Sequence, residues 1–468
     1  MAEHLERELK LSAPAGFHLP DLGGTELPGR SFVSTYHDTQ DLRLARHGIT
    51  FRHRLENGAG LWQLKLPRGE ARLELEEAGP PARPPEQLLG LLVAFLRDAE
   101  LVRVARLGTR RKSVQADGAE IVDDSVSVLD GQRVTSRFRE IEVELLEGDE
   151  RSLRRLEAAL REAGAEPGRF EPKLFRVLEL AYPLASALPA GSTPREVLGS
   201  ALDRERARLL AHDPGTRLGS DAEELHQMRV ATRRGRAFLR TVRPLLEAEW
   251  AESLRAELRW LGSELGRARD LDVLSGHLRV EVRRLGEAET EAQGLLETLD
   301  EERRRAHERA VATLSTERYF ALLDRLEEGA LRAAAETADG SLAALWWQDV
   351  RRASRAFRGL DDGSEDSELH AMRIRVKRAR YAAELAAAEL GESGARFVAA
   401  VKRVQDMLGE HQDAVVAQDR ITRWVAEGGS GEVAERLLRR ERSRQRGARA
   451  KWTKAWARAE QKAKRARP

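Results

Sequence analysis

The chain has 468 residues, of which 41% are hydrophobic and 34% are charged, so two or three domains with buried cores are expected. The formal net charge is only +2, and any affinity for polyanions must therefore come from how the charges are distributed. The absence of cysteine excludes disulfides and thiolate metal sites and fits a reducing cytoplasm. The sequence has no signal-peptide pattern and no apolar run of about 20 residues, so we expect a cytoplasmic protein outside the membrane.

The stretch Glu6-Arg7-Glu8-Leu9-Lys10 alternates charged side chains along a strand-like segment. In a strand, Glu6, Glu8 and Lys10 share one face, with successive charges about 7 Å apart. Such a face fits either a solvated edge strand or a site for a divalent metal bound to a polyanion. These five residues alone favour the edge strand. The segment 139–145 repeats the pattern with three glutamates and shifts the balance toward a site.

Short alternating segments separated by turns fill the first 145 residues. We expect strands at 31–36, 49–55, 61–66, 71–77, 110–115, 119–125 and 138–145, and helices at 86–104 and 152–163. Asn57-Gly58, Asp117-Gly118 and Asp130-Gly131 are typical of hairpin turns. The strands carry charges on one face and apolar residues on the other, so either face is a candidate for the inside. The recurrence of the pattern over so many strands favours a charged interior.

The charged segments resemble, in order, those of CYTH domains, the triphosphate tunnel metalloenzymes. The resemblance covers roughly residues 3–182 and rests on the Glu-x-Glu-x-Lys signature at 6–10 and on the segments 36–39, 48–54, 62–65, 109–111, 123–124 and 139–145. It implies a closed antiparallel β tunnel or barrel, with flanking helices, that binds a triphosphate or polyphosphate chain. It also implies Mg²⁺ or Mn²⁺ as cofactor, since these hard cations prefer carboxylate oxygen. A loop of unusual length between Asp124 and Glu140 is the main departure.

The resemblance also implies a role for each charged residue of the tunnel. The catalytic residues would be Glu6, Glu8 and Lys10. The metal ligands would be Glu6, Glu8, Asp124, Glu140, Glu142 and Glu144. The residues that hold the phosphates would be Lys10, Arg52, Arg54, Lys65, Arg72, Arg111 and Lys173. Arg110 is an alternative to Arg111 for the inward position.

Residues 183–194 are rich in Pro, Ala, Ser and Gly and lack an apolar period, which predicts a linker. Thr193 can cap a helix whose first residue is Pro194. We therefore expect one domain at 1–182 and a second at 195–468. The sequence leaves open whether the linker is a hinge or a fixed spacer.

From Arg195 onward, helix-forming residues dominate and the sequence contains an internal duplication. The segment 224–230 recurs 144 residues later at 368–374, and the segment 265–270 recurs 143 residues later at 408–413. Two matched pairs at nearly one offset predict a duplicated helical bundle. The residues of the first copy expected to face its core are Leu225, Met228, Thr232, Gly235 and Leu239.

A basic stripe lies beside the core-facing stripe in both copies. It consists of His226, Arg229, Arg233, Arg236 and Arg240 in the first copy and of His370, Arg373, Lys377 and Arg380 in the second. Like charges at these spacings repel by roughly 0.2–0.5 kcal/mol per pair, a cost that a bound polyanion would remove. A solvated face balanced by acidic helices is the alternative. The recurrence of the stripe with a histidine at the same place favours anion binding.

This half resembles the CHAD domain over roughly residues 190–460, through the doubled His-x-x-Arg-x-x-x-Arg/Lys pattern. The resemblance implies two four-helix bundles related by pseudo-symmetry, with a basic groove that binds inorganic polyphosphate. The residues implied in that binding are His226, Arg229, Arg233, Arg234, Arg236, His370, Arg373, Lys377, Arg378 and Arg380. His411 lies in the second matched segment, but its counterpart is Ala268, so it is left out of the set.

The final segment, 436–468, contains 14 Lys or Arg against two Glu. Trp452 and Trp456 stand one helical turn apart and indicate a helix with an apolar anchor. Attraction between this segment and any polyanion would depend on salt. Nucleic acid is the weaker candidate partner for it.

The two halves together predict an α+β chain, with an antiparallel β tunnel followed by an all-α, duplicated four-helix-bundle domain. The predicted function is a metal-dependent triphosphatase acting on inorganic triphosphate, polyphosphate or a nucleoside triphosphate, beside a domain that binds polyphosphate. One alternative is a non-catalytic polyphosphate-binding protein associated with polyphosphate granules. A second alternative, ranked lower because no adenine-reading motif is present, is an adenylate cyclase.

Overall fold

The structure is a computed structural model that describes residues 2–14, 16–69, 71–147, 149–168, 171–182, 188–189, 191–335 and 340–468. The chain divides into two compact units, Met1–Ser186 and Ala187–Pro468, and each is described by itself. Of the expected linker, residues 183–187 and 190 lie outside the described residues. Thr193 forms a capping box with Glu196 at the start of the helix that begins at Pro194, as predicted.

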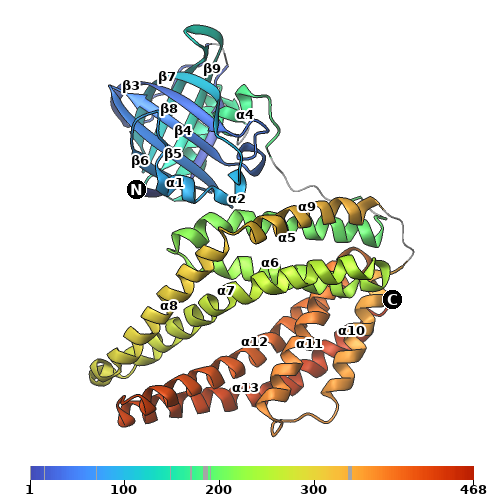
Figure 1. The fold of residues 1–468 in the computed structure, drawn as a ribbon. Helices are drawn as coiled ribbons and strands as arrows, with labels where there is room; N and C mark the ends of the chain where they lie inside the picture. The colour runs from blue at the N-terminus through green and yellow to red at the C-terminus, as the bar shows by residue number, and fades with distance from the viewer. Residues whose placement is uncertain are drawn as a thin grey trace. The chain divides into compact units, whose positions relative to one another are not determined.

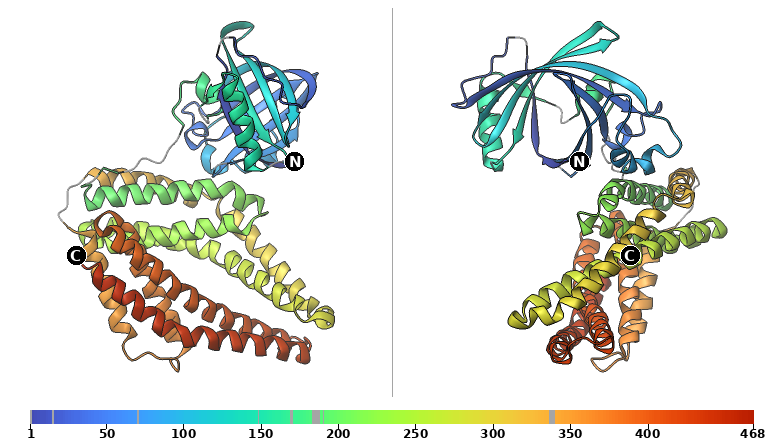
Figure 2. Two further views of the ribbon diagram at one scale, coloured as in Figure 1. Left: turned by 180° about the vertical axis from the view of Figure 1, so that it is seen from behind. Right: turned by 60° about the vertical axis from the view of Figure 1, so that its left-hand side comes forward.

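The first unit is built on one strongly curved antiparallel sheet (Figures 1 and 2). Among the described residues it has ten strands, in the order β1-β6-β5-β4-β3-β7-β8-β9-β2-β10. Their bounds are β1 Ala2–Glu6, β2 Glu8–Ser12, β3 Thr25–Asp38, β4 Thr50–Glu56, β5 Ala59–Arg68, β6 Ala71–Ala78, β7 Val102–Ala116, β8 Ala119–Asp130, β9 Arg133–Leu145 and β10 Glu166–Pro167.

The expected opening strand is split at Arg7, and this split decides how the sheet curves. β1 pairs with β6, with Glu6 opposite Arg72, whereas β2 pairs with β9, with Glu8 opposite Glu144. One short piece of chain therefore borders both halves of the sheet. The closed tunnel that was predicted is not complete, because β1 and β10 end the hydrogen-bonded order without pairing with each other.

The turns between strands follow the predicted hairpin dipeptides. Asn57 and Gly58 both have positive φ, +49° and +81°, as do Asp117 and Gly118, at +50° and +74°. The strands expected between residues 31 and 145 are all present; that expected at 49–55 is shifted by one residue, and the others extend beyond their expected bounds.

One expected helix is wrong in its extent. The segment predicted as helix 86–104 contains only α1 (Glu86–Gly90) and α2 (Val93–Leu96). Arg97 ends α2 with a φ of +51°, and the chain then enters β7 at Val102. The remaining helical segments of this unit are η1 Ala45–His47, α3 Glu150–Glu162 and α4 Lys173–Val177.

The apolar face of β2 and β9 lies outside, under α3. Leu11, Ile141 and Val143 form one core cluster with Leu156 and Leu160 of α3. Since neighbouring residues of a strand point to opposite faces, the charged neighbours of these residues face the inside of the sheet. The sequence left open which face of the strands lies inside, and the packing of α3 shows that it is the charged face.

The second unit is all-helical, so the predicted α+β class is confirmed. Its helices are α5 Pro194–Leu218, α6 Ala222–Thr241, η2 Arg243–Leu245, α7 Ala248–Arg283, η3 Gly286–Ala292, α8 Gln293–Thr313, α9 Glu317–Ala335, α10 Leu342–Phe357, α11 Asp366–Leu385, α12 Ala387–Ala426 and α13 Gly431–Arg465. Among the described residues, each helix is too short or too polar to cross a membrane.

The helices pack as two similar groups (Figure 1). In the first group α6 packs on α5 and α7, α8 packs on α7, and α9 packs on α5. In the second group α10, α11, α12 and α13 pack in succession. The helices α8 and α9 thus take the place of the single helix α13. The groups meet where α6 contacts α11, and the predicted core residues Leu225, Met228, Thr232, Gly235 and Leu239 are buried.

The tryptophans of α13 provide a test of the second unit's stability. Trp452 is 2% exposed, its ring lies 5.2 Å from that of Phe357, and Trp456 stacks on Phe357 at 4.1 Å. We expect Trp452→Ala to lower the free energy of unfolding of this unit by about 3–5 kcal/mol, because it leaves a cavity in the core. Urea denaturation followed by circular dichroism measures the change. The half-buried Trp347 offers a control, and an equal loss in Trp347→Ala would contradict the anchoring role.

Candidate functional site

Glu142 on β9 is the centre of a charge network inside the sheet. Its Oε1 accepts hydrogen bonds from Nζ of Lys10 at 2.6 Å and from Nζ of Lys173 at 2.7 Å. Nη2 of Arg111 lies 3.5 Å from its other oxygen. Burial by itself would raise the pKa of Glu142, but these three cations hold it well below its ordinary value. Glu140 faces the same two lysines, at 3.4 and 3.1 Å.

Asp124 on β8 joins this network and settles which arginine points inward. It is completely buried and receives two hydrogen bonds from Arg111, at 2.9 and 2.7 Å. Nζ of Lys173 lies 3.1 Å from the same carboxylate. Arg110 is exposed, so Arg111 occupies the inward position. Asp123, on the opposite face of β8, pairs instead with Arg139 at 2.7 Å.

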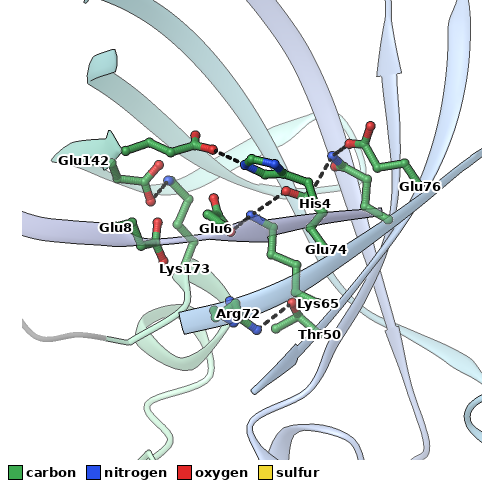
Figure 3. Close-up of polar contacts among 12 residues, drawn as sticks. His4, Glu6, Glu8, Thr50, Lys65, Arg72, Glu74, Glu76, Glu142 and Lys173 are labelled. Atoms are coloured by element: carbon green, nitrogen blue, oxygen red, sulfur yellow. Dashed lines mark hydrogen bonds and ion pairs between the residues drawn. The ribbon is translucent and has the colours of Figure 1, made fainter. Parts of the chain in front are cut away.

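A second group of charges surrounds Lys65 on β5 (Figure 3). Nζ of Lys65 lies 2.6 Å from Oε2 of Glu6 and 3.2 Å from Oε2 of Glu74. Gln63 donates to Glu74 at 2.9 Å and accepts from Nε of Arg52 at 2.8 Å. The strands β1, β4, β5 and β6 therefore contribute to one polar surface.

Glu8 and Arg72 complete the inner face. Glu8 lies 3.5 Å from Nζ of Lys10. Nη2 of Arg72 donates to Oγ1 of Thr50 (Figure 3) and to the carbonyl oxygen of Gly48, each at 3.2 Å. Carboxylates and cations therefore share the inner face of the sheet.

Arg54 on β4 is a buried cation with little negative charge beside it. Among the described side chains, its Nε and Nη2 are buried without a hydrogen-bond partner, although Nη2 lies 3.4 Å from Glu56. Burial, together with Arg52, Arg30 and Arg111, lowers the pKa of Arg54 to about 10. An anion placed among these arginines would remove the cost of their mutual repulsion.

In the second unit, basic side chains from both copies converge where α6 meets α11. Nη1 of Arg229 donates to the carbonyl oxygen of Gly266 at 2.8 Å and to Asp270 at 2.7 Å. A Cβ built on Gly409 would lie 3.7 Å from the guanidinium of Arg373, as one on Gly266 would from that of Arg229. In each copy, the duplicated segment that carries the arginine therefore contacts the duplicated segment that carries the glycine.

Lys377 on α11 lies among these arginines. Burial and the proximity of Arg373, Arg233 and Arg229 lower its pKa to about 7. Among the described atoms, Nε of Arg233 and Nε of Arg373 are buried without a hydrogen-bond partner. We call Arg229, Arg233, Arg373 and Lys377 the central basic cluster.

Comparison with known proteins agrees with both units. The family model of the CYTH domain matches residues 4–175, and that of the CHAD domain matches residues 200–422. An uncharacterized protein of Mycobacterium tuberculosis (strain CDC 1551 / Oshkosh) is 31% identical over 482 residues, covering 92% of this chain and 91% of the relative. This chain belongs to the proteins that carry a CYTH domain followed by a CHAD domain.

Solved structures are similar to each part. The CHAD domain from the plant Ricinus communis matches at 26% identity with a TM-score of 0.49, covering 59% of this chain and 94% of its own. HpAC1 from Hippeastrum, which shows a dominant triphosphatase activity, matches at 20% identity with a TM-score of 0.28, covering 38% of this chain and 97% of its own.

CYTH domains are generally enzymes that use divalent metals, and the carboxylates of this CYTH domain fit such an ion in their chemistry. They offer hard oxygen donors, and burial together with Glu6 and Glu74 raises the pKa of Glu144 to about 7. A divalent cation would relieve that crowding. Among the described residues, no group of three or more His, Asp or Glu is arranged to hold a metal ion. The carboxylates contact lysines and arginines instead.

Of the other basic residues assigned to the CHAD domain, several have partners outside the central basic cluster, whereas His226 lies close enough to Arg229 and Arg233 for both to lower its pKa. Arg234 pairs with Glu205 and Glu384, and Arg380 donates to Glu384 and Gln405. His370 lies 2.9 Å from Gln412. The last three assigned residues lie next to other arginines: His226 beside Arg269, Arg236 beside Arg259, and Arg378 beside Arg240.

Sequence reasoning missed several members of the CYTH network, among them Gln63 and Glu74. Both stand on the charged faces of their strands, Gln63 beside Lys65 and Glu74 beside Arg72, so the alternation placed them but assigned them no role. Gln63 links Arg52 to Glu74 through its amide. Their position two residues from an assigned cation, on the same face of the strand, could have identified them as part of the site.

Proposed function

We propose that the CYTH domain hydrolyses phosphoanhydride bonds of inorganic triphosphate, polyphosphate or a nucleoside triphosphate, with Mg²⁺ or Mn²⁺, and that the CHAD domain binds polyphosphate. The observation that supports the hydrolase most is the inner face of the sheet, where Lys10, Lys65 and Lys173 each contact two or more carboxylates. A substrate phosphate would compete for these lysines and free the carboxylates for metal.

The residues of the tunnel would act mainly by position and electrostatics, which carry most of the catalysis of phosphoryl transfer. Arg52, Arg54 and Arg111 would hold the phosphate chain, since their guanidinium groups match phosphate oxygens. A divalent ion on the carboxylates would supply Lewis-acid polarisation of the phosphoryl oxygens. Burial keeps these charges in a medium of low dielectric, where they act more strongly than in water.

The central basic cluster supports polyphosphate binding by the CHAD domain. It gathers four cations from the two copies, and Asp270 and Asp413 are the acidic groups beside them. A polyanion across α6 and α11 would neutralise the excess positive charge. Bound polyphosphate would also hold the protein on polyphosphate granules.

One assay tests the proposal. Phosphate release should be measured with triphosphate, long polyphosphate and ATP, each with Mg²⁺, with Mn²⁺ and with chelator. We expect metal-dependent release from triphosphate. Tight binding of all three without release would favour a non-catalytic protein, and cyclic AMP formed from ATP would favour a cyclase.

Lys377 makes polyphosphate binding depend on pH. Its pKa lies near 7 in the folded protein, and a bound polyanion stabilises the charged form. We therefore expect affinity for long polyphosphate to rise up to about tenfold as the pH falls from about 8.5 to about 6, with proton uptake at the higher pH. Calorimetry in two buffers of different ionisation enthalpy measures both.

The matched control for this effect is Lys377→Arg, which keeps the charge over the whole range. Its binding should change less with pH, and an unchanged pH profile would contradict the role of Lys377. The stability of the CHAD domain should change in the opposite sense. Because the unfolded lysine binds a proton that the folded one lacks, stability should rise as the pH increases from about 7 toward the ordinary pKa of lysine.

A further inference from the structure

The CHAD domain contains a cavity of about 510 Å³ between α6, α10 and α11. It is lined by Arg240, Asp349, Arg352, Ala353, Arg355, Ala356, Arg375 and Arg378. Five arginines therefore face one carboxylate. We call this group the arginine pocket. Asp349 is 8% exposed and receives a hydrogen bond from Arg352 at 3.1 Å.

The arginine pocket is separate from the central basic cluster, although both involve α11. At about 100° per residue, Arg375 points to the side of α11 opposite Arg373, and Arg378 is rotated from Arg373 by roughly 140°. The pocket is lined on one side by α10, whereas the central basic cluster is flanked by Gly266 and Gly409 on α7 and α12.

The internal duplication supplies a direct comparison for this pocket. Shifting by 144 residues pairs Arg378 with Arg234, Asp349 with Glu205 and Arg352 with Arg208. In the first copy, Arg234 lies 2.8 Å from Glu205 and 2.8 Å from Glu384, and Arg208 lies 3.3 Å from Glu205. At the positions matched to the pocket, two arginines therefore stand beside two glutamates, and Glu384 also pairs with Arg380.

The balance is lost in the second copy through three differences. Glu384 is the counterpart of Arg240, Ala231 is that of Arg375, and Ala211 is that of Arg355. A carboxylate has become a cation, and two small residues have become arginines. Five arginines and one aspartate give the pocket a formal charge of +4, whereas the six matched positions of the first copy sum to zero.

The local electrostatics agree with this reading. Burial lowers the pKa of Arg378 and that of Arg240, and the neighbouring Arg375 and Arg255 lower both further. Among the groups that act on both arginines, Asp349 is the one that raises their pKa. Arg378 and Arg240 thus keep their positive charges at a cost that an anionic ligand would offset.

We propose that the arginine pocket is a second anion site, which binds a compact anion carrying two or three adjacent phosphoryl groups. Several guanidinium forks around one small cavity can give bidentate hydrogen bonds to successive phosphates, and the excess of four charges matches such an anion. A short free oligophosphate and the end of a longer chain share this chemistry. The proposal does not depend on hydrolysis in the CYTH domain.

The test uses the full chain, with pyrophosphate as the probe and a chelator present. Isothermal titration should show a site that is weakened at least about tenfold in Arg375→Ala, which copies Ala231 of the first copy. Arg240→Glu, which copies Glu384, should remove it. Both variants reproduce arrangements that already fold in the other copy. Arg351→Glu, an exposed charge reversal on α10 outside the pocket, is the matched control and should bind normally.

The source of the ligand is distinguished by competition. Long polyphosphate that displaces pyrophosphate at equal chain concentration would assign the pocket to chain ends, and failure to displace it would assign it to free oligophosphate. Unchanged pyrophosphate binding in both Arg375→Ala and Arg240→Glu, with unchanged circular dichroism, would overturn the proposal. Loss of binding in Arg351→Glu as well would also overturn it, because the effect would then be one of net charge.

Discussion

Replacing Glu6 or Glu8 by glutamine is expected to slow metal-dependent phosphate release by the CYTH domain severely. Each residue supplies a carboxylate beside a buried lysine, Glu6 at 2.6 Å from Lys65 and Glu8 at 3.5 Å from Lys10. Glutamine keeps the shape but loses the charged oxygen that a divalent cation requires. Loss of a metal's contribution of several kcal/mol corresponds to a rate lower by about 100–1000-fold.

The matched control for these variants is Asp123→Asn. Asp123 is also a nearly buried carboxylate paired with an arginine, but it lies on the outer face of β8, against Arg139. The Asp123→Asn variant should be less stable than the native protein. Its folded fraction should keep metal-dependent turnover. Thermal unfolding of each variant separates the two effects. Full turnover in Glu6→Gln would exclude Glu6 as a metal ligand.

The metal dependence itself offers a second readout. If Glu6 and Glu8 bind the ion, the activity that remains in the glutamine variants should need a higher concentration of Mn²⁺ for half-maximal phosphate release. A lower maximal rate with an unchanged Mn²⁺ requirement would place these residues elsewhere in the mechanism.

The charged interior of the CYTH domain was predictable because β strands have a strict period of two. Alternation placed Lys10, Glu140 and Glu142 on one face and Leu11 and Ile141 on the other. The period alone does not say which face is inside. The packing of α3 against the apolar face decides that, and it requires contacts that are distant in sequence.

The errors in the CYTH domain come from local geometry. Leucine-rich residues after Glu86 fit a helix, but Arg97 adopts a left-handed conformation and the following residues pair in β7. Helix propensities do not predict where a left-handed residue ends a helix. The break at Arg7 was missed for a similar reason, because both halves of the opening stretch have the same alternation and differ only in their partners.

The CHAD domain shows what a duplication reveals and what it hides. The recurrence of two segments predicted the repeated bundle, and the packing of Arg229 beside Gly266 explains why both segments recur together. The sequence did not predict that Arg233 of one copy would lie near Arg373 and Lys377 of the other. Contacts between the two copies join residues that no single repeat contains.

Replacing Arg229 and Arg373 together by alanine is expected to weaken the binding of long polyphosphate by about 100-fold while triphosphate hydrolysis continues. Each arginine would contribute charge-assisted hydrogen bonds to phosphate worth about 1.5–3 kcal/mol. Removing two positive charges should also reduce the slope of log affinity against log salt by about one per arginine, as for other polyanions. Titration of fluorescent polyphosphate over a salt series measures both quantities.

A charge-matched control distinguishes a site from a general field. Arg351→Ala with Arg423→Ala removes the same two charges from exposed positions on α10 and α12. Because exposed charges are screened within about 10 Å at 0.1 M salt, this pair should change affinity only slightly. Equal weakening by both pairs would show that net charge, not the central basic cluster, governs binding. Parallel loss of triphosphate hydrolysis in Arg229→Ala with Arg373→Ala would contradict two separable sites, because these arginines belong to the CHAD domain and the hydrolysing residues to the CYTH domain.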